Sequence, residues 1–464
     1  MGWKVPASIR WISATMATHD PQLTKSSLLA ERAGKVFGPE EADLVSRAAH
    51  FAGRKLSSDD RLAFSVAQLL LDQGADPLTV SVALLAPTLW HTCTDVCEIR
   101  QVFDPTVAAA VSELGSPTIL RTDTEPHRRS DLHKLLTSLA SDPRRAVLKI
   151  AFRLVELEEA LESRTEDLDD KVRETLDVYV PIAGRLGLGE LRKRLEDVSF
   201  HILDAPAYEE LKKKVAPIQA EDEACLKILL EGTRLLLDKN GIQGRVQGRT
   251  KSLYGIHVKM ARTGASLEAI MDRIGLRIIV TKVLECYSVL GLVHTHFKPV
   301  PGTFDDYIGL PKENGYQSLH TCVYPVRDIS RKPIEFQIRT ELMHIEAEHG
   351  AAAHWRYKSR ANGPDSATSQ TQWLQRLVGQ HCKAQSADEF IRLLKRQVYE
   401  DQLVVFGRAG LIARLSGGAT VRDYLKRYHP DSSPELQVRV NGRPVSRDHR
   451  LHDGDSIELS RSTA

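Results

Sequence analysis

The residues of this sequence best suited to do chemistry lie in short segments between positions 249 and 339. The first segment, GRTKSLYGIHVKM, places Arg249, Lys251 and Lys259 within eleven residues, beside a glycine-containing turn. Such closely spaced cations can bind a polyphosphate, because charge-assisted hydrogen bonds to phosphate oxygens are strong. Taken alone, three cations of this kind more often form a solvated basic face.

Two further segments carry carboxylates near apolar strands. Asp272 precedes the apolar run LRIIV (276–280), and loops at strand ends commonly present functional groups. In IEFQIRT, the residues Glu335, Gln337 and Arg339 alternate with apolar ones, so a strand sends all three to one face. We expect this polar face not to be buried away from water. In isolation, a capping or turn role explains Asp272 better than a site does, and a solvated sheet face explains the second segment equally well.

Between these segments runs a Gly- and Pro-punctuated stretch with the composition of a functional loop. Its polar and aromatic residues are Asp305, Asp306, Lys312, Asn314, Tyr316 and His320. An aromatic side chain flanked by an amide and a cation can stack on a base, which contributes about 1–3 kcal/mol. Because Mg²⁺ is held by one or two carboxylates together with substrate phosphates, Asp272 and Glu335 suggest Mg²⁺-dependent chemistry on nucleotides. An ordinary surface loop is the simpler alternative.

The composition is that of a soluble globular protein. The chain has 464 residues, 42% of them hydrophobic and 27% charged, and a net charge of +2, which excludes a wholly basic nucleic-acid coat protein. No apolar run approaches the roughly 20 residues that span a bilayer. Six scattered cysteines in a chain this long do not require disulfides, which favours a reducing cytoplasm.

The expected secondary structure changes from helices to a mixture of helices and strands along the chain. Apolar spacing predicts helices from 25 to about 200, and helices alternating with short strands from about 205 to 360. A polar linker passing into a helix follows over 359–385, and 402–464 reads as short strands with turns. The dipeptide Asn441–Gly442 is a strong hairpin signal.

In order and spacing, these segments resemble the RelA/SpoT family of (p)ppGpp synthetases. The resemblance is dense over 245–360 and includes CYSVLGLVHTHFKPVPGTFDDYIGLPKENGYQSLHT and MHIEAEHGAAAHWRYK. It implies a multidomain α and α/β protein, with an HD-like helical domain, a nucleotidyltransferase-like synthetase domain with a mixed sheet, and a small β-grasp TGS domain. The expected parts are a frayed start (1–24), a degenerate HD-type domain (25–195), the synthetase domain (200–360), a linker and helix (361–400) and the TGS-like domain (401–464).

The resemblance implies pyrophosphoryl transfer from ATP to the 3′-hydroxyl of GTP or GDP, giving (p)ppGpp and AMP in the stringent response. Asp272 would bind Mg²⁺, and Glu335 would help to hold that metal and position or deprotonate the acceptor hydroxyl. On the ATP side, the family's phosphate ligands correspond to Arg249, Lys251 and Lys259, and a residue near adenine corresponds to Arg277.

On the acceptor side, Tyr316 would stack on guanine. The other residues implied to bind the guanine nucleotide are Lys312, Asn314, His320 and Gln337. One departure concerns ATP: the family usually has Ser where this chain has Gly255, which weakens one expected contact.

The loop TFDDYIG bears on acceptor preference. Bifunctional relatives tend to carry a basic residue where Asp305 stands, whereas synthesis-only relatives carry an acidic pair, as in Asp305–Asp306. The resemblance therefore points to the synthesis-only type, which tends to prefer GTP. Thr303 departs from the acidic residue usual at its position.

The helical region lacks the ligands of an HD hydrolase. Aligned with that pattern, the metal positions hold Leu62, Ala86, Pro87 and Phe152, and Trp90–His91 stand where an acidic catalytic pair is expected. Apolar side chains cannot bind the metal, so we expect no (p)ppGpp hydrolysis and a domain that restrains the synthetase by packing. A metal cluster of His91 with Cys93 and Cys97 is the alternative, but it has no obvious fourth ligand.

The last segment resembles the TGS module, which in this family meets the acceptor end of uncharged tRNA on the ribosome. Residues 402–464 hold ten Lys or Arg against seven Asp or Glu, a weak argument for RNA binding. We therefore expect a cytoplasmic ATP:GTP 3′-diphosphotransferase (GTP diphosphokinase), with Mg²⁺ as cofactor, ATP and GTP or GDP as substrates and the ribosome and tRNA as further partners. The alternative is a catalytically weak or inactive regulator that binds ribosome or tRNA.

Overall fold

The computed structural model describes most of the chain, and the chain divides into two compact units, residues 1–379 and 380–464. The described residues are 21–57, 60–115, 125–163, 168–267, 270, 273–312, 315–324, 333–358, 366–399, 402–407, 411–416, 418–429, 436–452 and 454–461.

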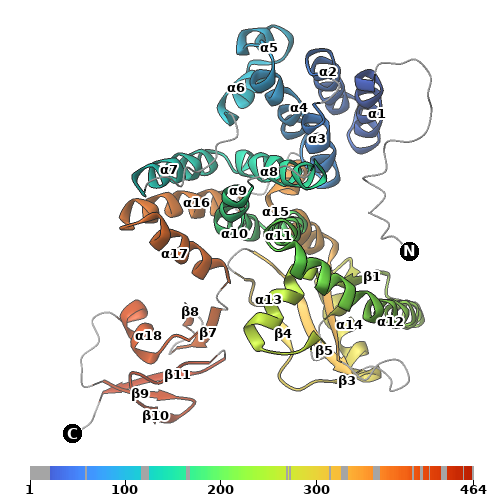
Figure 1. Cartoon of the computed structure of the whole chain (residues 1–464). Coiled ribbons are helices and arrows are strands. Elements are labelled where there is room, and N and C mark those ends of the chain that lie inside the picture. The colour runs from blue at the N-terminus through green and yellow to red at the C-terminus, as the bar shows by residue number, and fades with distance from the viewer. Residues whose placement is uncertain are drawn as a thin grey trace. The chain divides into compact units, whose positions relative to one another are not determined.

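The first half of the larger unit is helical, as the apolar spacing predicts (Figure 1). Its elements are α1 (Pro21–Val36), α2 (Pro39–Lys55), α3 (Leu62–Asp72), α4 (Pro77–His91), α5 (Val96–Val102), α6 (Pro105–Leu114), α7 (Glu125–Ser141), α8 (Pro143–Ser163), α9 (Asp169–Glu174), the π-helical η1 (Thr175–Tyr179) and α10 (Val180–Arg185). Aspartates cap several helices: Asp76 accepts a hydrogen bond from the Thr79 backbone N–H at 3.1 Å, and Pro77 then occupies the first turn.

Two helices lead from this region to the sheet. A turn at Gly187, which has a φ of +73°, separates α10 from α11 (Gly189–Leu203). The long α12 (Ala205–Lys239) follows. None of the helices in the described part of the chain has the length and apolar character that a membrane crossing requires.

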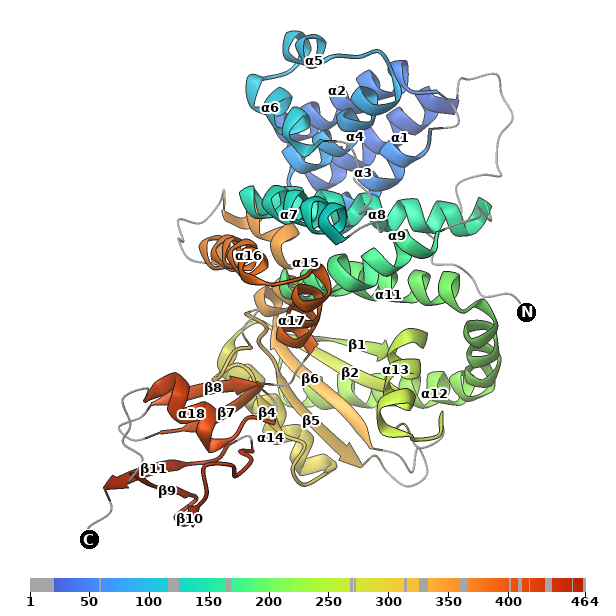
Figure 2. The ribbon, with the colours of Figure 1, turned by 60° about the vertical axis from the view of Figure 1, so that its left-hand side comes forward.

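A mixed sheet forms the second half of the larger unit, as predicted (Figure 2). The strand order is β1-β2-β6-β5-β3, with β4 also paired to β5; β2 and β6 are parallel and the other described pairs antiparallel. The elements are β1 (Gly244–Thr250), α13 (Leu253–Thr263), β2 (Ile274–Val280), α14 (Val283–His296), β3 (Lys298–Pro299), β4 (Asp305–Asp306), β5 (Leu319–Tyr324), β6 (Ile334–Thr340) and α15 (Glu341–Lys358).

One face of this sheet forms the apolar core of the second half of the larger unit. Alternate residues of the two central strands meet there, namely Ile274, Leu276, Ile278, Val280, Ile334, Phe336 and Ile338. Buried residues of α12 and α14 cover this face: Cys225, Leu229, Leu237, Cys286, Val289 and Val293. Because side chains alternate along a strand, every second residue of β2 and β6 is left for the opposite, polar face.

The smaller unit has its own core. Its elements are α17 (Ala387–Tyr399), β7 (Gln402–Phe406), β8 (Ile412–Ser416), α18 (Val421–Tyr428), β9 (Leu436–Val440), β10 (Arg443–Val445) and β11 (Ile457–Arg461), while α16 (Ser366–Lys383) spans the boundary. The predicted hairpin at Asn441–Gly442 is confirmed: both residues have positive φ, +51° and +76°, and join β9 to β10. A parallel bridge between Phe406 and Ser456 links the β7–β8 hairpin to the other strands.

The helix α13 is held in place by a carboxylate from α11. Ser252 caps α13 by accepting a hydrogen bond from the Gly255 N–H at 3.1 Å, and Asp197 accepts one from the Tyr254 N–H at 2.9 Å. Burial raises the pKa of Asp197 to about 6, although its hydrogen bonds with the Tyr254 N–H and the Ser252 side chain work in the opposite direction.

We predict that Asp197 makes the protein less stable as the pH rises from about 4 to about 6. In that window the folded state holds a proton that the unfolded state, with an Asp pKa near 3.8, has released. Asp197→Asn keeps an oxygen that can accept from Tyr254 and should remove this fall. Denaturant unfolding at pH 4 and pH 7.5 measures it, with Asp204→Asn, an exposed cap of α12, as the control. Parallel pH curves for wild type and Asp197→Asn would contradict it.

Candidate functional site

The polar face of the sheet carries the predicted row of β6. Glu335, Gln337 and Arg339 lie opposite the apolar residues of the same strand, as their spacing predicts. The expectation that this face is not buried is wrong for two of the three: Gln337 is 3% exposed and Arg339 1% exposed. Arg339 is buried because α15, which follows β6 directly, supplies His344 and Glu348 as polar partners, and sequence spacing does not show these contacts. Gln337 donates from its Nε2 to Glu335 of the same strand.

The carboxylate of Glu335 remains accessible. Its side chain is 27% exposed, and its Oε2 accepts a hydrogen bond from Gln337 Nε2 at 3.1 Å and lies 3.8 Å from Arg249 Nη1. In the strand register, Gly275 stands between Glu335 and Arg249. A Cβ at Gly275 would lie 3.0 Å from the backbone oxygen of Glu335, so only glycine fits this position without a shift. The carboxylate and the first of the predicted phosphate-binding cations therefore share one open part of the face.

A chain of hydrogen bonds connects Glu335 to the predicted guanine-binding residues. His320 Nδ1 lies 3.1 Å from Glu335 Oε1, and His320 Nε2 lies 2.7 Å from the Tyr316 hydroxyl. With Nδ1–H donating to the carboxylate, Nε2 accepts from the Tyr316 O–H. Burial raises the pKa of Tyr316, so the phenol keeps the proton that this hydrogen bond needs. The contact orients both rings and the carboxylate together.

Aromatic rings and a cation surround this histidine. Tyr307 packs edge-on against His320, with ring centres 5.2 Å apart, and against Tyr316 at 6.2 Å. Lys312 Nζ lies 4.3 Å from the centre of the Tyr307 ring and 5.9 Å from that of Tyr316. Sequence reasoning missed Tyr307. Its position one residue after the acidic pair was the available signal.

The remaining predicted phosphate ligands lie on the segment that follows β1. The Lys251 N–H donates to the Arg273 carbonyl at 2.8 Å, which ties the end of β1 to the start of β2, and Lys259 lies on α13. At Gly255, a Cβ would lie 3.3 Å from Lys251 Cγ and 3.2 Å from Ser252 Oγ. The Ser usual in the family would thus press on Lys251, and Gly255 gives this lysine more room.

The two acidic residues of β4 have different surroundings. Asp306 Oδ1 accepts hydrogen bonds from the N–H groups of Ile308 and Gly309 at 3.0 and 2.8 Å, and Oδ2 accepts from the Tyr287 hydroxyl at 3.0 Å. Asp305 is exposed and pairs in register with His320. Asp306 therefore organises the loop, and Asp305 is the member of the pair next to the predicted guanine site.

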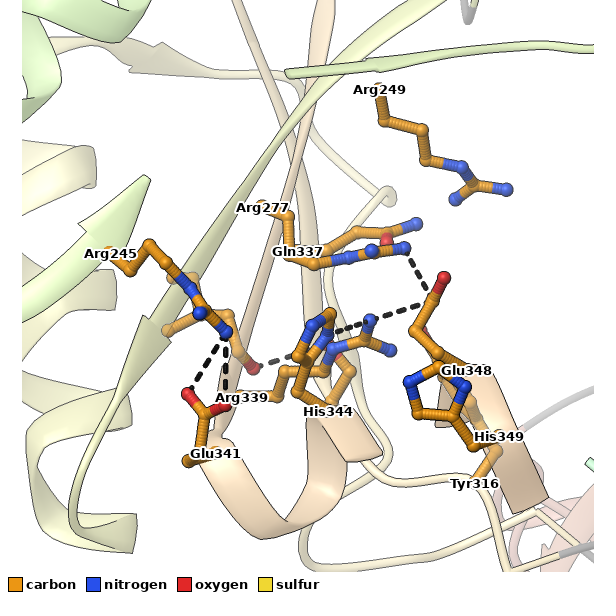
Figure 3. Close-up of polar contacts among 12 residues, drawn as sticks. Arg245, Arg249, Arg277, Tyr316, Gln337, Arg339, Glu341, His344, Glu348 and His349 are labelled. Atoms are coloured by element: carbon orange, nitrogen blue, oxygen red, sulfur yellow. Dashed lines mark hydrogen bonds and ion pairs between the residues drawn. The ribbon is translucent and has the colours of Figure 1, made fainter. Parts of the chain in front are cut away.

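At the other end of the polar face, α15 closes over two arginines (Figure 3). Glu348 Oε1 lies 2.9 Å from both Arg277 Nη2 and Arg339 Nη2, and Arg339 Nη2 also donates to His344 Nδ1 at 2.8 Å. Burial and the adjacent Arg339 lower the pKa of His344 to about 4, so the ring is neutral and Nδ1 can accept. Although burial opposes it, Arg277 and Arg339 hold the pKa of Glu348 at about 2.

Sequence reasoning missed Glu348 and His344. Both lie in a quoted family segment, but nothing in their spacing pairs them with strand arginines. Burial, together with Arg339, lowers the pKa of Arg277 to about 10. Arg277 Nε, Arg339 Nε and Gln337 Oε1 are buried and have no hydrogen-bond partner among the described residues, so the protein leaves two buried donors and one buried acceptor on this face.

Two predicted site residues, Asp272 and Asn314, lie outside the described residues. The structure thus brings together Arg249, Arg277, Glu335, Gln337, His320 and Tyr316 on one face of the sheet, with Lys312 beside Tyr316.

In the helical region, the positions aligned with hydrolase ligands are apolar and buried. Leu62, Ala86 and Phe152 are among the core residues of α3, α4 and α8, and the Phe152 ring packs on Trp90 with centres 5.0 Å apart. His91 contacts Asp60, while Cys93 and Cys97 are exposed free thiols. These contacts do not support the alternative metal cluster of His91 with the two cysteines.

Comparison with known proteins gives matches to both regions. Residues 248–362 match the region found in RelA and SpoT proteins, and residues 42–189 match an HD domain. A probable guanosine-3′,5′-bis(diphosphate) 3′-pyrophosphohydrolase from Synechocystis sp. is 34% identical over 420 residues, 88% of this chain and 55% of that protein. The GTP pyrophosphokinase rsh of Brucella ovis is 32% identical over 451 residues, 94% of this chain and 60% of that protein.

Among solved structures, small alarmone synthetase 1 from Bacillus subtilis bound to its product pppGpp is 25% identical, covers 38% of this chain and 96% of its own, and has a TM-score of 0.27. A helical HD domain followed by a mixed-sheet synthetase domain defines the class of protein. The chain belongs to the RelA/SpoT family. It spans 55% and 60% of the length of the two relatives named above.

We predict that Asp306→Ala lowers the unfolding free energy by about 2–3 kcal/mol, because three hydrogen bonds worth about 1 kcal/mol each are lost. Asp305→Ala, the matched control one residue away, should change it by less than about 0.5 kcal/mol, since this side chain is exposed. Urea unfolding of the two variants measures the difference. Equal destabilisation by both substitutions would show that Asp306 does not organise the loop.

Proposed function

We propose that this protein transfers the pyrophosphoryl group of ATP to the 3′-hydroxyl of GTP or GDP, giving (p)ppGpp and AMP. The observation that carries the proposal is the accessible carboxylate of Glu335, which contacts His320 on one side and Arg249 on the other, within the segment that matches RelA and SpoT proteins. The naming of the Brucella ovis relative as a GTP pyrophosphokinase supports it.

On the ATP side, Arg249, Lys251 and Lys259 bind the phosphates and Arg277 lies by adenine. The cations neutralise charge on the phosphate oxygens, and a guanidinium can stack on a flat ring with its face while its edge makes hydrogen bonds. Arg277 has an edge suited to such hydrogen bonds. Glu348 contacts its Nη2, and the buried Nε of Arg277 has no hydrogen-bond partner among the described residues.

On the acceptor side, Tyr316 stacks on guanine and its hydroxyl stays bonded to His320. Lys312 lies against the aromatic group and is available to phosphate, and the unpartnered Oε1 of Gln337 can accept from a base N–H. Asn314 is a further residue that we propose to bind the guanine nucleotide, on the ground of the family resemblance alone. Together these residues place the 3′-hydroxyl of the acceptor near Glu335.

The residues present fit Mg²⁺. Carboxylate oxygens are the donors this ion prefers, and the partly exposed Glu335 supplies them; Asp272 is the second ligand we propose. When bound, Mg²⁺ would neutralise charge on the ATP phosphates during transfer.

The chemistry of the chain's own residues is then positioning and proton removal. The acceptor 3′-oxygen forms a bond to the β-phosphorus of ATP, the bond between that phosphorus and the bridging α,β-oxygen breaks, and AMP leaves with the bridging oxygen. Glu335 accepts the proton of the 3′-hydroxyl, held in orientation by His320 and Gln337.

We further propose that this chain is of the synthesis-only type, with GTP preferred. The acidic Asp305 beside His320 supports the preference. The apolar, buried Leu62, Ala86 and Phe152, with Pro87, support the loss of hydrolysis, although the Synechocystis relative is named as a pyrophosphohydrolase.

The smaller unit is proposed to be a TGS-like β-grasp domain that binds tRNA on the ribosome, with the protein acting in the cytoplasm. Its support is the order of elements: a hairpin, α18, then three strands, with β7 bridged in parallel to the start of β11.

The decisive experiment incubates the purified protein with labelled ATP, GTP and Mg²⁺ and looks for a pyrophosphorylated guanosine product. We expect product from the wild type and a loss of at least about a hundredfold in rate for Glu335→Gln and Asp272→Asn, because each removes a charge the transition state needs. Glu341→Gln, an exposed change on α15, is the control and should stay active. No product from a folded wild type would instead favour the non-catalytic regulator.

The same preparation tests hydrolysis. With ppGpp and added Mn²⁺, we expect no release of pyrophosphate, because the four apolar residues leave no ligand for a metal. Circular dichroism confirms that the helical region is folded. Mn²⁺-dependent release of pyrophosphate that chelator abolishes would refute the synthesis-only proposal while leaving synthesis untouched.

A further inference from the structure

Three consecutive residues of α15 contact three different parts of the larger unit. Glu348 contacts Arg277 of β2 and Arg339 of β6 at 2.9 Å each. The next residue, His349, makes a hydrogen bond from Nδ1 to Oε1 of Gln73, at the end of α3 in the HD-like region, at 3.2 Å. Figure 3 shows Glu348 and His349 side by side on this segment.

The third residue fixes the backbone. Gly350 has a φ of +46° and interrupts α15, and a Cβ there would clash with the Leu186 carbonyl oxygen and the backbone of Gly187. Gly187 in turn would place a Cβ 3.1 Å from Gly350 Cα. Backbone meets backbone here with no side chain between, so α15 cannot slide past the turn between α10 and α11 without breaking this contact.

Glu348 also balances the positive charges of two arginines. Arg339 is 1% exposed, so its charge cannot be solvated by water and must be balanced inside the protein. Arg277 and Arg339 repel each other, and the carboxylate between them allows both guanidinium groups to point toward the same oxygen. Without that carboxylate, the less buried Arg277 is the one free to swing away.

We propose that Glu348 is a positioning residue that holds Arg277 in place for ATP, and that the HD-like helices set Glu348 through His349 and Gly350. This inference rests on the proposed function and goes beyond it. It assigns a residue outside the expected site and names the contact by which the helical region reaches the ATP side. The opposite possibility, that Glu348 keeps Arg277 away from ATP, predicts tighter ATP use when Glu348 is changed.

The test is the steady-state kinetics of the full chain. Glu348→Gln should raise the KM for ATP about tenfold, the loss of one charge-assisted hydrogen bond, and leave the KM for GTP within about twofold. Glu341→Gln is the matched control: the same substitution on the same helix breaks only the exposed pair with Arg245 and should change neither constant. Calorimetric titration with a non-hydrolysable ATP analogue should show the same tenfold weakening.

A second variant tests the link to the helical region. Gln73→Ala, which removes the acceptor of His349, should raise the KM for ATP about two- to threefold with the KM for GTP unchanged. If Glu348→Gln fails to fold, as judged by circular dichroism, Gln73→Ala decides the inference. Equal effects on both nucleotides, no effect, or a lower KM for ATP would overturn it. A wild type that makes no product would refute the proposed function first.

Discussion

The buried guanidinium of Arg339 is the constraint on which the polar face of the sheet depends. An arginine that is 1% exposed destabilises a fold unless a carboxylate and further acceptors surround it. Here Glu348 and His344 supply them, and both come from α15, the helix that begins directly after β6. The helix must therefore fold back toward its own strand, and in doing so its Glu348 also reaches Arg277 of β2 and closes one end of the face.

The two ends of that face consequently differ in character. At the closed end, Arg277, Arg339 and Glu348 form a rigid charged cluster with little access to water. At the open end, Glu335 stays accessible and is oriented by His320. The proposed transfer, which binds a highly charged nucleotide and moves a proton, needs both: fixed charges that do not reorganise, and a carboxylate that substrate can reach. The same strand, β6, supplies residues to each end.

The helical region has the fold of an HD domain without the metal-binding side chains expected of an HD hydrolase. Its match to an HD domain and its buried core persist, while the positions that would hold a metal carry Leu62, Ala86, Pro87 and Phe152. The apolar side chains at these positions pack in the core of the region, so the proposed absence of hydrolysis is compatible with an intact fold. What remains useful is the surface that meets α15 at Gln73 and Gly187.

By itself, the sequence determined the succession of helical and mixed-sheet regions, the hairpin at Asn441–Gly442 and the shared face of Glu335, Gln337 and Arg339. These follow from local periodicity and turn chemistry, which act over a few residues. Only the tertiary structure decided that this face is half closed, that Asp306 rather than Asp305 organises the loop, and that Glu348 joins Arg277 to Arg339. Those features depend on side chains that are distant in sequence and meet only after the sheet and α15 have packed, so no local pattern encodes them.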